Sequence, residues 1–217
     1  MDADILALLE VPPAWQPWLH TQQLPYPFQV GVLRDDPFGI WVLSRHPGRL
    51  TVHIATGETP WVRLALVRTA NRPPVEVLVL HPPLPINAEL SAWRNQQLTD
   101  LLVPTSALRV VVSDFNLTPW SPWNALLLDR SQLLDAGAVL PPSGTWPALL
   151  PSWMALPIDR TVVSAGISVV ARRVLPGQGL PSDHRAIWNQ LCFQYRMSTE
   201  RLPYPTIFRW KLTFCMS

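Results

Sequence analysis

Several residue types are scarce in this 217-residue chain, and each scarcity excludes a class of protein. The two cysteines and nine glycines exclude a disulfide scaffold and a collagen-like chain. Charged residues make up only 15%, against roughly 25% in an average soluble domain. No apolar run approaches the ~18–20 residues of a membrane-spanning helix, and the first residues are acidic where a secretory signal is basic. We therefore expect the chain as given to be soluble, and cytoplasmic by default.

Basic residues are almost all arginines, and they are unevenly distributed. Lys211 is the only lysine. Residues 193–217 contain four basic residues and one acidic residue, a balance of +3, whereas residues 1–192 contain 13 basic and 14 acidic residues, a balance of −1. A nearly neutral body does not suit a protein that grips long duplex nucleic acid through many phosphates.

This change in composition marks the one domain boundary that the sequence indicates. We expect a domain over residues 1–192 and a basic, aromatic tail over residues 193–217. The tail could pack on the body, mediate self-association, lie at a membrane surface or stay unstructured, and the sequence does not choose among these roles. Cys192 and Cys215 are too far apart for a metal knuckle or a redox motif, so we interpret both as ordinary thiols.

Apolar residues, 48% of the chain, occur mainly in short runs that prolines separate. Nine runs are rich in Val, Ile and Leu and are predicted strands: 28–33, 39–45, 50–55, 61–68, 75–81, 108–113, 158–164, 167–175 and 186–191. Residues 4–9 form an apolar run too short to assign. Many strands with few helices predict two packed β layers covered by helices, an α+β fold.

Helical signals are limited to two segments. Asn87 is the expected N-cap of a helix that runs to about Leu102 with its leucines on one face. Ser121 followed by Pro122 predicts the start of a second helix, which continues through Leu128.

Polar residues stand at the ends of several predicted strands, where a core strand would not place them. Asp114 and Asn116 follow the strand 108–113, and residues two apart at a strand end point to the same side. A carboxylate there can accept a proton from water, and a carboxamide can donate hydrogen bonds to a substrate oxygen. Taken alone, the pair fits a simple Asp/Asn turn after a strand better than a catalytic pair.

Three further positions carry groups that titrate or orient. His81 ends the strand 75–81, and a histidine there suits either a structural role or acid–base work near neutral pH. Asp159 begins another strand, and Asp183-His184 lies in a loop before the last one. A carboxylate that bonds one imidazole nitrogen selects the tautomer and aims the other nitrogen.

These motifs together resemble the endonuclease/exonuclease/phosphatase superfamily, which has the deoxyribonuclease-I-like fold. Ser113-Asp114-Phe115-Asn116 resembles its Gly-Asp-Phe-Asn signature, with serine in place of glycine. Ser182-Asp183-His184 matches its closing motif, and the segment from Asp4 to Val11 resembles the one that carries its metal-binding glutamate. His81-Pro82 and Ile158-Asp159-Arg160 complete an ordered set over about residues 3–191. The resemblance implies a four-layer α/β/β/α sandwich.

The resemblance also implies a metal-dependent phosphoesterase. Glu10 would bind a divalent cation, Mg²⁺ or alternatively Mn²⁺, and Asp183 would complete the metal network. Asn116 would hold a phosphate oxygen or support the metal. A hard cation of this kind prefers carboxylate and water ligands.

The remaining roles implied by the resemblance are catalytic. Asp114 would activate or orient the attacking water. His184 would act on the phosphoryl group as an acid or base, with Asp159 orienting it, and His81 would lie on the other side of the phosphate. Such a site would hydrolyse a phosphodiester or phosphomonoester by in-line attack of water.

One departure from the family pattern concerns the start of the chain. The family usually opens with a strand that carries a metal-site asparagine, and this chain begins only nine residues before Glu10. We therefore expect a truncated first sheet and reduced metal affinity, and a catalytically impaired binding or scaffold module is the alternative function. Nucleic acid, a lipid headgroup or a small phosphate all stay open as the substrate. The oligomeric state is open, and membrane association would need the tail or an upstream segment.

Overall fold

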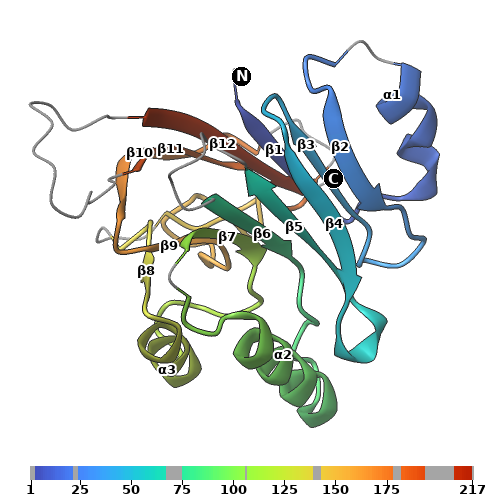
Figure 1. The fold of residues 1–217 in the computed structure, drawn as a ribbon. Coiled ribbons are helices and arrows are strands. Elements are labelled where there is room, and N and C mark those ends of the chain that lie inside the picture. Colours follow the sequence, from blue (N-terminus) through green and yellow to red (C-terminus); the bar gives the residue numbers. More distant parts are fainter. Residues whose placement is uncertain are drawn as a thin grey trace, which may run out of the picture.

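The computed structural model describes residues 3–21, 24–66, 75–105, 107–138, 143–177, 182–193 and 208–216. Within them, two six-stranded sheets lie face to face (Figure 1). The first sheet, in the order β10-β11-β12-β1-β3-β2, contains β1 (Ile5–Leu9), β2 (Phe28–Val32), β3 (Ile40–Ser44), β10 (Ile167–Val174), β11 (Ile187–Phe193) and β12 (Phe208–Met216). The second, in the order β4-β5-β6-β7-β9-β8, contains β4 (Gly48–Ile54), β5 (Pro60–Leu66), β6 (Val75–Leu80), β7 (Leu108–Asp114), β8 (Leu133–Asp135) and β9 (Asp159–Ser164).

The main core lies between the two sheets because the strands alternate their side chains. In β6, Val75, Val77 and Val79 face the first sheet, whereas Leu78 and Leu80 face outward. The three valines of β6 pack against residues of the first sheet such as Ile5 and Ile40. Period-two alternation thus gives each sheet one face for the shared core and one for the helices.

Helices cover the two outer faces. The helices α2 (Ala88–Leu101) and α3 (Pro122–Ser131) lie on the second sheet (Figure 1), where Leu98 and Leu127 pack on outward residues of β6 and β7. The short α1 (Gln16–Thr21) follows the 3₁₀ turn Pro13–Trp15, and its Leu19 packs on Leu8 and Trp41 of the first sheet. This α/β/β/α arrangement confirms the predicted α+β sandwich. No helix within the described ranges is long and apolar enough to cross a membrane.

Most predicted elements occur within a few residues of their expected ends, and three differences are informative. Residues 4–9, left unassigned, form β1, and α1 and β8 carried no signal strong enough to predict them. The oxygen Oδ1 of Asn87 accepts the Leu90 amide at 2.8 Å, so the predicted cap is present. The buried face of α2 includes Arg94 and Gln97, not only leucines, because the Arg94 guanidinium donates to a backbone carbonyl of the candidate site.

The C-terminal segment differs from its interpretation as a tail. Phe208–Met216 forms β12, which runs parallel to β1 and antiparallel to β11. At its middle, Leu212 pairs with Ile5 on one side and Asn189 on the other. These residues are therefore a central strand of the first sheet. Composition suggested a separate tail because charge and aromatic content do not report backbone pairing; residues 194–207 of that tail lie outside the described residues.

Candidate active site

Strand alternation directs the polar strand ends into the space between the two sheets. In β7, Val110 and Val112 face the shared core, so Asp114 at the end of the same strand points the same way. His81 follows the inward valines of β6, and Asp159 lies on the same face of β9 as Val163. The sequence therefore builds an apolar core that ends in a cluster of titratable groups.

These groups line one cleft of about 410 Å³ at that end of the sandwich. Six of the seven predicted site residues contact it: Glu10, His81, Asp114, Asn116, Asp183 and His184. The seventh, Asp159, is fully buried behind His184. Residues from the beginning, middle and end of the chain are thus brought together, and the roles assigned to them stay predictions.

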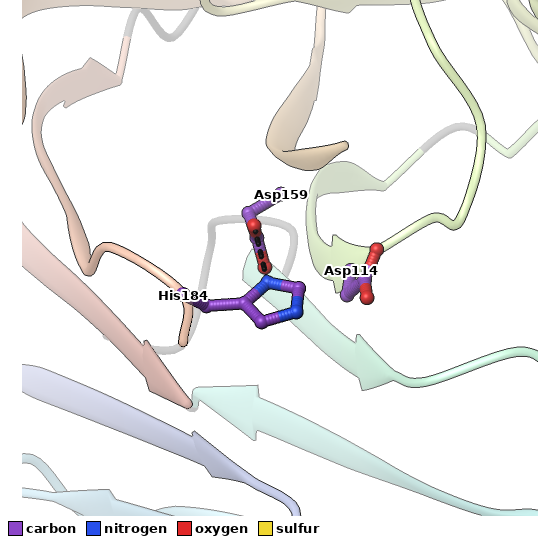
Figure 2. A group of neighbouring side chains, drawn as sticks. All are labelled: Asp114, Asp159 and His184. Atoms are coloured by element: carbon purple, nitrogen blue, oxygen red, sulfur yellow. Dashed lines mark hydrogen bonds and ion pairs between the residues drawn. The ribbon is translucent and has the colours of Figure 1, made fainter. Parts of the chain in front are cut away.

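His184 and Asp159 form a buried pair (Figure 2). The His184 Nδ1 donates to Asp159 Oδ2 at 2.8 Å, which leaves Nε2 for the cleft. Burial lowers the pKa of His184, but the bond to Asp159 and the charge of that carboxylate outweigh it and raise the pKa to about 9. His184 is therefore an imidazolium at neutral pH in the metal-free protein.

His81, directly after β6, is anchored in a similar way. Its Nδ1 lies 3.0 Å from the carbonyl oxygen of Pro37, which can only accept, so Nδ1 carries the proton. Nε2 then lies 3.7 Å from Asp114 Oδ2 and 4.0 Å from Glu10 Oε1. Burial lowers the pKa of His81, yet the neighbouring Asp114 raises it above the ordinary value overall, with a further contribution from Glu10.

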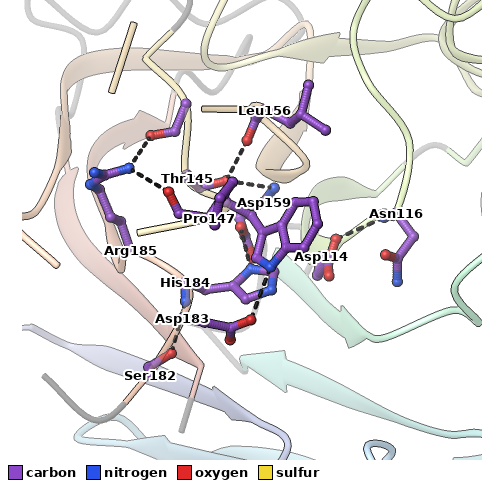
Figure 3. Close-up of polar contacts among 12 residues, drawn as sticks. Asp114, Asn116, Thr145, Pro147, Leu156, Asp159, Ser182, Asp183, His184 and Arg185 are labelled. Atoms are coloured by element: carbon purple, nitrogen blue, oxygen red, sulfur yellow. Dashed lines mark hydrogen bonds and ion pairs between the residues drawn. The ribbon is translucent and has the colours of Figure 1, made fainter. Parts of the chain in front are cut away.

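Asp114 and Asn116 form the turn that ends β7 as well as part of the cleft (Figure 3). Asp114 Oδ1 accepts the Asn116 amide at 2.7 Å, and Asn116 Nδ2 donates to the carbonyl of Pro82 at 3.0 Å. The buried Arg94 donates to the Asn116 carbonyl at 2.8 Å and supports this residue at φ 48°. The Asp/Asn turn and the site are therefore the same structure, and the two sequence interpretations were not exclusive.

Glu10 also has a left-handed backbone, with φ 56°, directly after β1. A non-glycine residue in this region costs about 1 kcal/mol or more, and such strain collects at functional sites. The Glu10 side chain is a third exposed, and burial is the main cause that raises the pKa of its carboxyl. The histidines His81 and His184 act in the opposite direction, towards ionisation.

Two residues that the sequence argument did not single out contact the predicted site residues, and Figure 3 labels Thr145 beside Asp159. Trp146 lines the cleft, and its Nε1 donates to Asp183 Oδ2 at 2.9 Å. Thr145 Oγ1 accepts the Asp159 amide at 3.2 Å and so positions the residue that orients His184. Both lie outside the helices and strands.

The donor set at the cleft fits a hard divalent cation. Glu10, Asp114 and Asp183 present carboxylates to the cleft, and among its described lining residues there is no lysine or arginine to neutralise them. Ligand atoms of Asp114, Asp159 and His184 lie within 4.8 Å of one another. The buried Asp159 Oδ1 has no hydrogen-bond partner within the described residues, which is costly for a carboxylate oxygen unless a cation or proton is near. Oxygen-rich ligands of this kind suit Mg²⁺.

Known structures with the same fold come from several organisms. An endonuclease/exonuclease/phosphatase from Beutenbergia cavernae is 17% identical, with 91% of this chain and 74% of that one covered and a TM-score of 0.63. A mannosyl-6-phosphatase from Bacteroides thetaiotaomicron is 16% identical, with 88% and 85% covered and a TM-score of 0.66. D. rerio TDP2, complexed with a single-strand DNA product, is 16% identical, with 87% and 85% covered and a TM-score of 0.65. No curated protein matches the sequence.

The family assignment comes from the sequence match together with this fold. The family model described as Endonuclease/Exonuclease/phosphatase family matches residues 1–184, which is most of the chain. Members of this family are hydrolases that act on phosphate esters. The sandwich with a carboxylate–histidine cleft between its sheets, and the match over residues 1–184, place this chain in the endonuclease/exonuclease/phosphatase family.

Proposed function

We propose that this protein hydrolyses phosphate esters by in-line attack of water, with Mg²⁺ or Mn²⁺ as its cofactor. The observation that carries the proposal is the pair of anchored histidines: His81 and His184 each bind an acceptor through Nδ1, which leaves Nε2 for the cleft that Asp114 also lines. A phosphate between them would meet a proton donor and a carboxylate base in one enclosed space.

The chain's own residues account for most of the chemistry. Asp114 would orient the attacking water and accept its proton. His184, an imidazolium because its pKa is about 9, would donate to a phosphoryl oxygen or the leaving oxygen, and Asp159 stabilises its charge. Asn116 uses one amide hydrogen on Pro82 and keeps the other for a phosphate oxygen. Glu10 and Asp183 would hold the cation, which when bound offsets the negative charge of the ester and the carboxylates.

Turnover with and without metal tests this proposal. We expect release of p-nitrophenol from bis(p-nitrophenyl) phosphate or p-nitrophenyl phosphate with Mg²⁺ or Mn²⁺, and loss of the signal with EDTA. Asp114→Asn and His184→Gln should each lower kcat about 10²–10⁴-fold, since general acid–base groups contribute on that scale. The matched controls are Asp100→Asn on the exposed side of α2 and His53→Gln on β4, both away from the cleft.

Two outcomes would contradict the proposal. One is turnover that EDTA leaves unchanged, and the other is turnover that Asp114→Asn and His184→Gln leave unchanged. If wild-type protein binds phosphate esters in a Mg²⁺-dependent manner but never releases product, the chain is the binding module that the sequence left as the alternative function.

A further inference from the structure

Much of the cleft lining is apolar. Asp114, Asp183 and the two histidines are among its polar residues. The rest of the lining includes the following side chains: Phe38, Leu84, Pro85, Trp146, Leu156 and Ile158. A cleft of about 410 Å³ has room for a phosphate and an attached organic group, because ligand sites of small molecules start near ~300 Å³. The organic part of the ester would therefore contact these apolar side chains.

Leu84 is held exposed at the mouth of the cleft by its neighbours in the chain. The sequence around it is Pro82-Pro83-Leu84-Pro85, and each proline restricts the backbone. The Pro82 carbonyl also accepts a hydrogen bond from Asn116, which ties this loop to the site. Leu84 is nevertheless 54% exposed. This stiff loop keeps the leucine side chain in contact with water. Covering that side chain with an apolar group therefore stabilises the complex.

Two aromatic rings of the cleft lining lie close to the histidines. The Phe38 ring lies 5.8 Å from the His81 ring, and the Trp146 ring lies 6.2 Å from the His184 ring, centroid to centroid. The hydrogen bond from Trp146 Nε1 to Asp183 holds the indole in place. An organic group on a phosphate between the histidines would meet these rings before it reached solvent.

Among the described residues, the cleft lining offers no lysine or arginine for a second phosphate. The nearby arginines bond inward instead: Arg94 donates to the Asn116 carbonyl, and Arg185 donates to the Ala148 carbonyl at 2.7 Å. A nucleic-acid strand needs lysine or arginine along its phosphates, and the described lining supplies neither for the phosphates next to the reacting one.

We propose that Leu84, Trp146 and Leu156 bind the organic group of the substrate, and that this group is apolar: the substrate is a phosphate ester of a hydrophobic alcohol or phenol. This inference rests on the proposed function for the position of the phosphate. It adds the substrate class, which the catalytic groups alone do not determine.

Binding of non-hydrolysable alkylphosphonates tests the inference without any need for turnover. We expect hexylphosphonate to bind at least about tenfold more tightly than methylphosphonate in calorimetry with Mg²⁺, since each buried methylene strengthens binding severalfold. Leu84→Ser should reduce the hexyl-to-methyl affinity ratio about threefold, and Leu84→Ser with Leu156→Ser should bring it close to one. Ile86→Ser is the matched control, because Ile86 is 73% exposed in the same loop but does not line the cleft.

Equal affinity for the two phosphonates in the wild type, or an unchanged ratio in Leu84→Ser, would overturn the inference. The p-nitrophenyl ester assay is separate, so its failure and the failure of this inference are distinguishable. An oligothymidylate that binds more tightly than hexylphosphonate would also overturn it.

A vesicle-binding experiment distinguishes a lipid in a bilayer from a soluble ester as the substrate. Cosedimentation of the wild type, but not of Leu84→Ser, with phosphatidylcholine vesicles that contain phosphatidic acid would assign the apolar group to a lipid in a bilayer. Hexylphosphonate selectivity without cosedimentation would assign it to a soluble ester. Either result supports an apolar ester.

Discussion

The two sheets are assembled from different parts of the chain. The second sheet uses one continuous stretch, from Gly48 to Ser164, and its strands β4 to β7 are neighbours in the sheet as they are in the sequence. The first sheet joins both ends of the chain, because β12 lies between β11 and β1. The second sheet therefore depends on short-range pairing, and the first on closing the longest loop in the molecule.

The candidate site inherits this difference. His81, Asp114, Asn116 and Asp159 come from β6, β7, β9 and their ends, all in the second sheet. Glu10 follows β1, and the His184 loop precedes β11, so the other half of the site lies on the two strands that β12 connects. The second sheet can present its half locally, whereas the distance from Glu10 to His184 depends on a strand about 200 residues from Glu10 along the chain.

Breaking β12 should have the largest effect. Leu212→Pro removes a ladder amide from a central strand, and proline there should cost about 3 kcal/mol or more of the free energy of unfolding. We expect turnover to fall at least about 100-fold because Glu10 and His184 separate. Urea unfolding and the p-nitrophenyl ester assay measure the two effects.

The control for this variant is a proline in an edge strand of the same sheet. Val170→Pro lies at the register shift of β10, where the ladder is already interrupted, and should be tolerated much better. Equal effects of the two substitutions would show that the first sheet does not depend on its central strand. Rescue of a chain ending at residue 207 by a peptide of residues 206–217, but not by a scrambled peptide, would support the pairing directly.

Within the second sheet, the contribution of Glu76 to the free energy of unfolding should depend on pH. Its carboxylate bonds Arg63 on β5 and Arg109 on β7, and although burial opposes ionisation, these bonds lower its pKa below the ordinary 4.5. A carboxyl pKa that is lower in the folded than in the unfolded protein stabilises the fold at pH values above the unfolded-state pKa. This stability is lost as the pH falls through the folded-state pKa. Glu76→Gln should thus cost about 2 kcal/mol at pH 7 and progressively less below about pH 4.5.

Urea unfolding from pH 3 to pH 7 measures this difference between Glu76→Gln and the wild type. A difference that stays constant with pH would contradict the ion-pair explanation. Glu89→Gln, in the exposed first turn of α2, is the matched control and should show little change at any pH.

Breaking a hydrogen bond that joins the two sheets beneath the site should have a smaller but still measurable effect on stability. Asn189 Nδ2 on β11 donates to Thr161 Oγ1 on β9 at 3.0 Å, and both side chains are buried. A double-mutant cycle with Asn189→Ala and Thr161→Val should give a coupling energy of about 1 kcal/mol. We also expect a lower kcat, because the bond aligns the strand beside His184 with the strand that begins at Asp159. No coupling would mean that the two sheets are aligned by apolar packing alone.

The smallest expected effect concerns backbone strain at Glu10. Glycine adopts a positive φ without a Cβ penalty, so Glu10→Gly should be about 1 kcal/mol more stable than Glu10→Ala. Both variants remove the carboxylate, so both should weaken Mg²⁺ binding to the same extent. Equal unfolding free energies for Gly and Ala would argue against a left-handed residue at this position.

Much of the second sheet was predictable because its signals are local. The valine-rich runs before His81 and Asp114 indicated strands, and Asn87 indicated the start of α2. Alternation alone placed Asp114 and Asn116 at a strand end. The roles of Glu10 and Asp183 came only from the family resemblance, since neither has a local pattern that distinguishes it from an ordinary surface acid.

The amino-acid sequence alone determined most of the strands, the polar side chains that end them and the family that the motifs resemble, because these properties depend on neighbours a few residues apart. Only the tertiary structure decided that β12 completes the first sheet, that Arg94 turns inward to the Asn116 carbonyl, and that Leu84 and Trp146 line the cleft. Such features depend on which distant backbone edges and surfaces come into contact, and composition and periodicity do not indicate those long-range contacts.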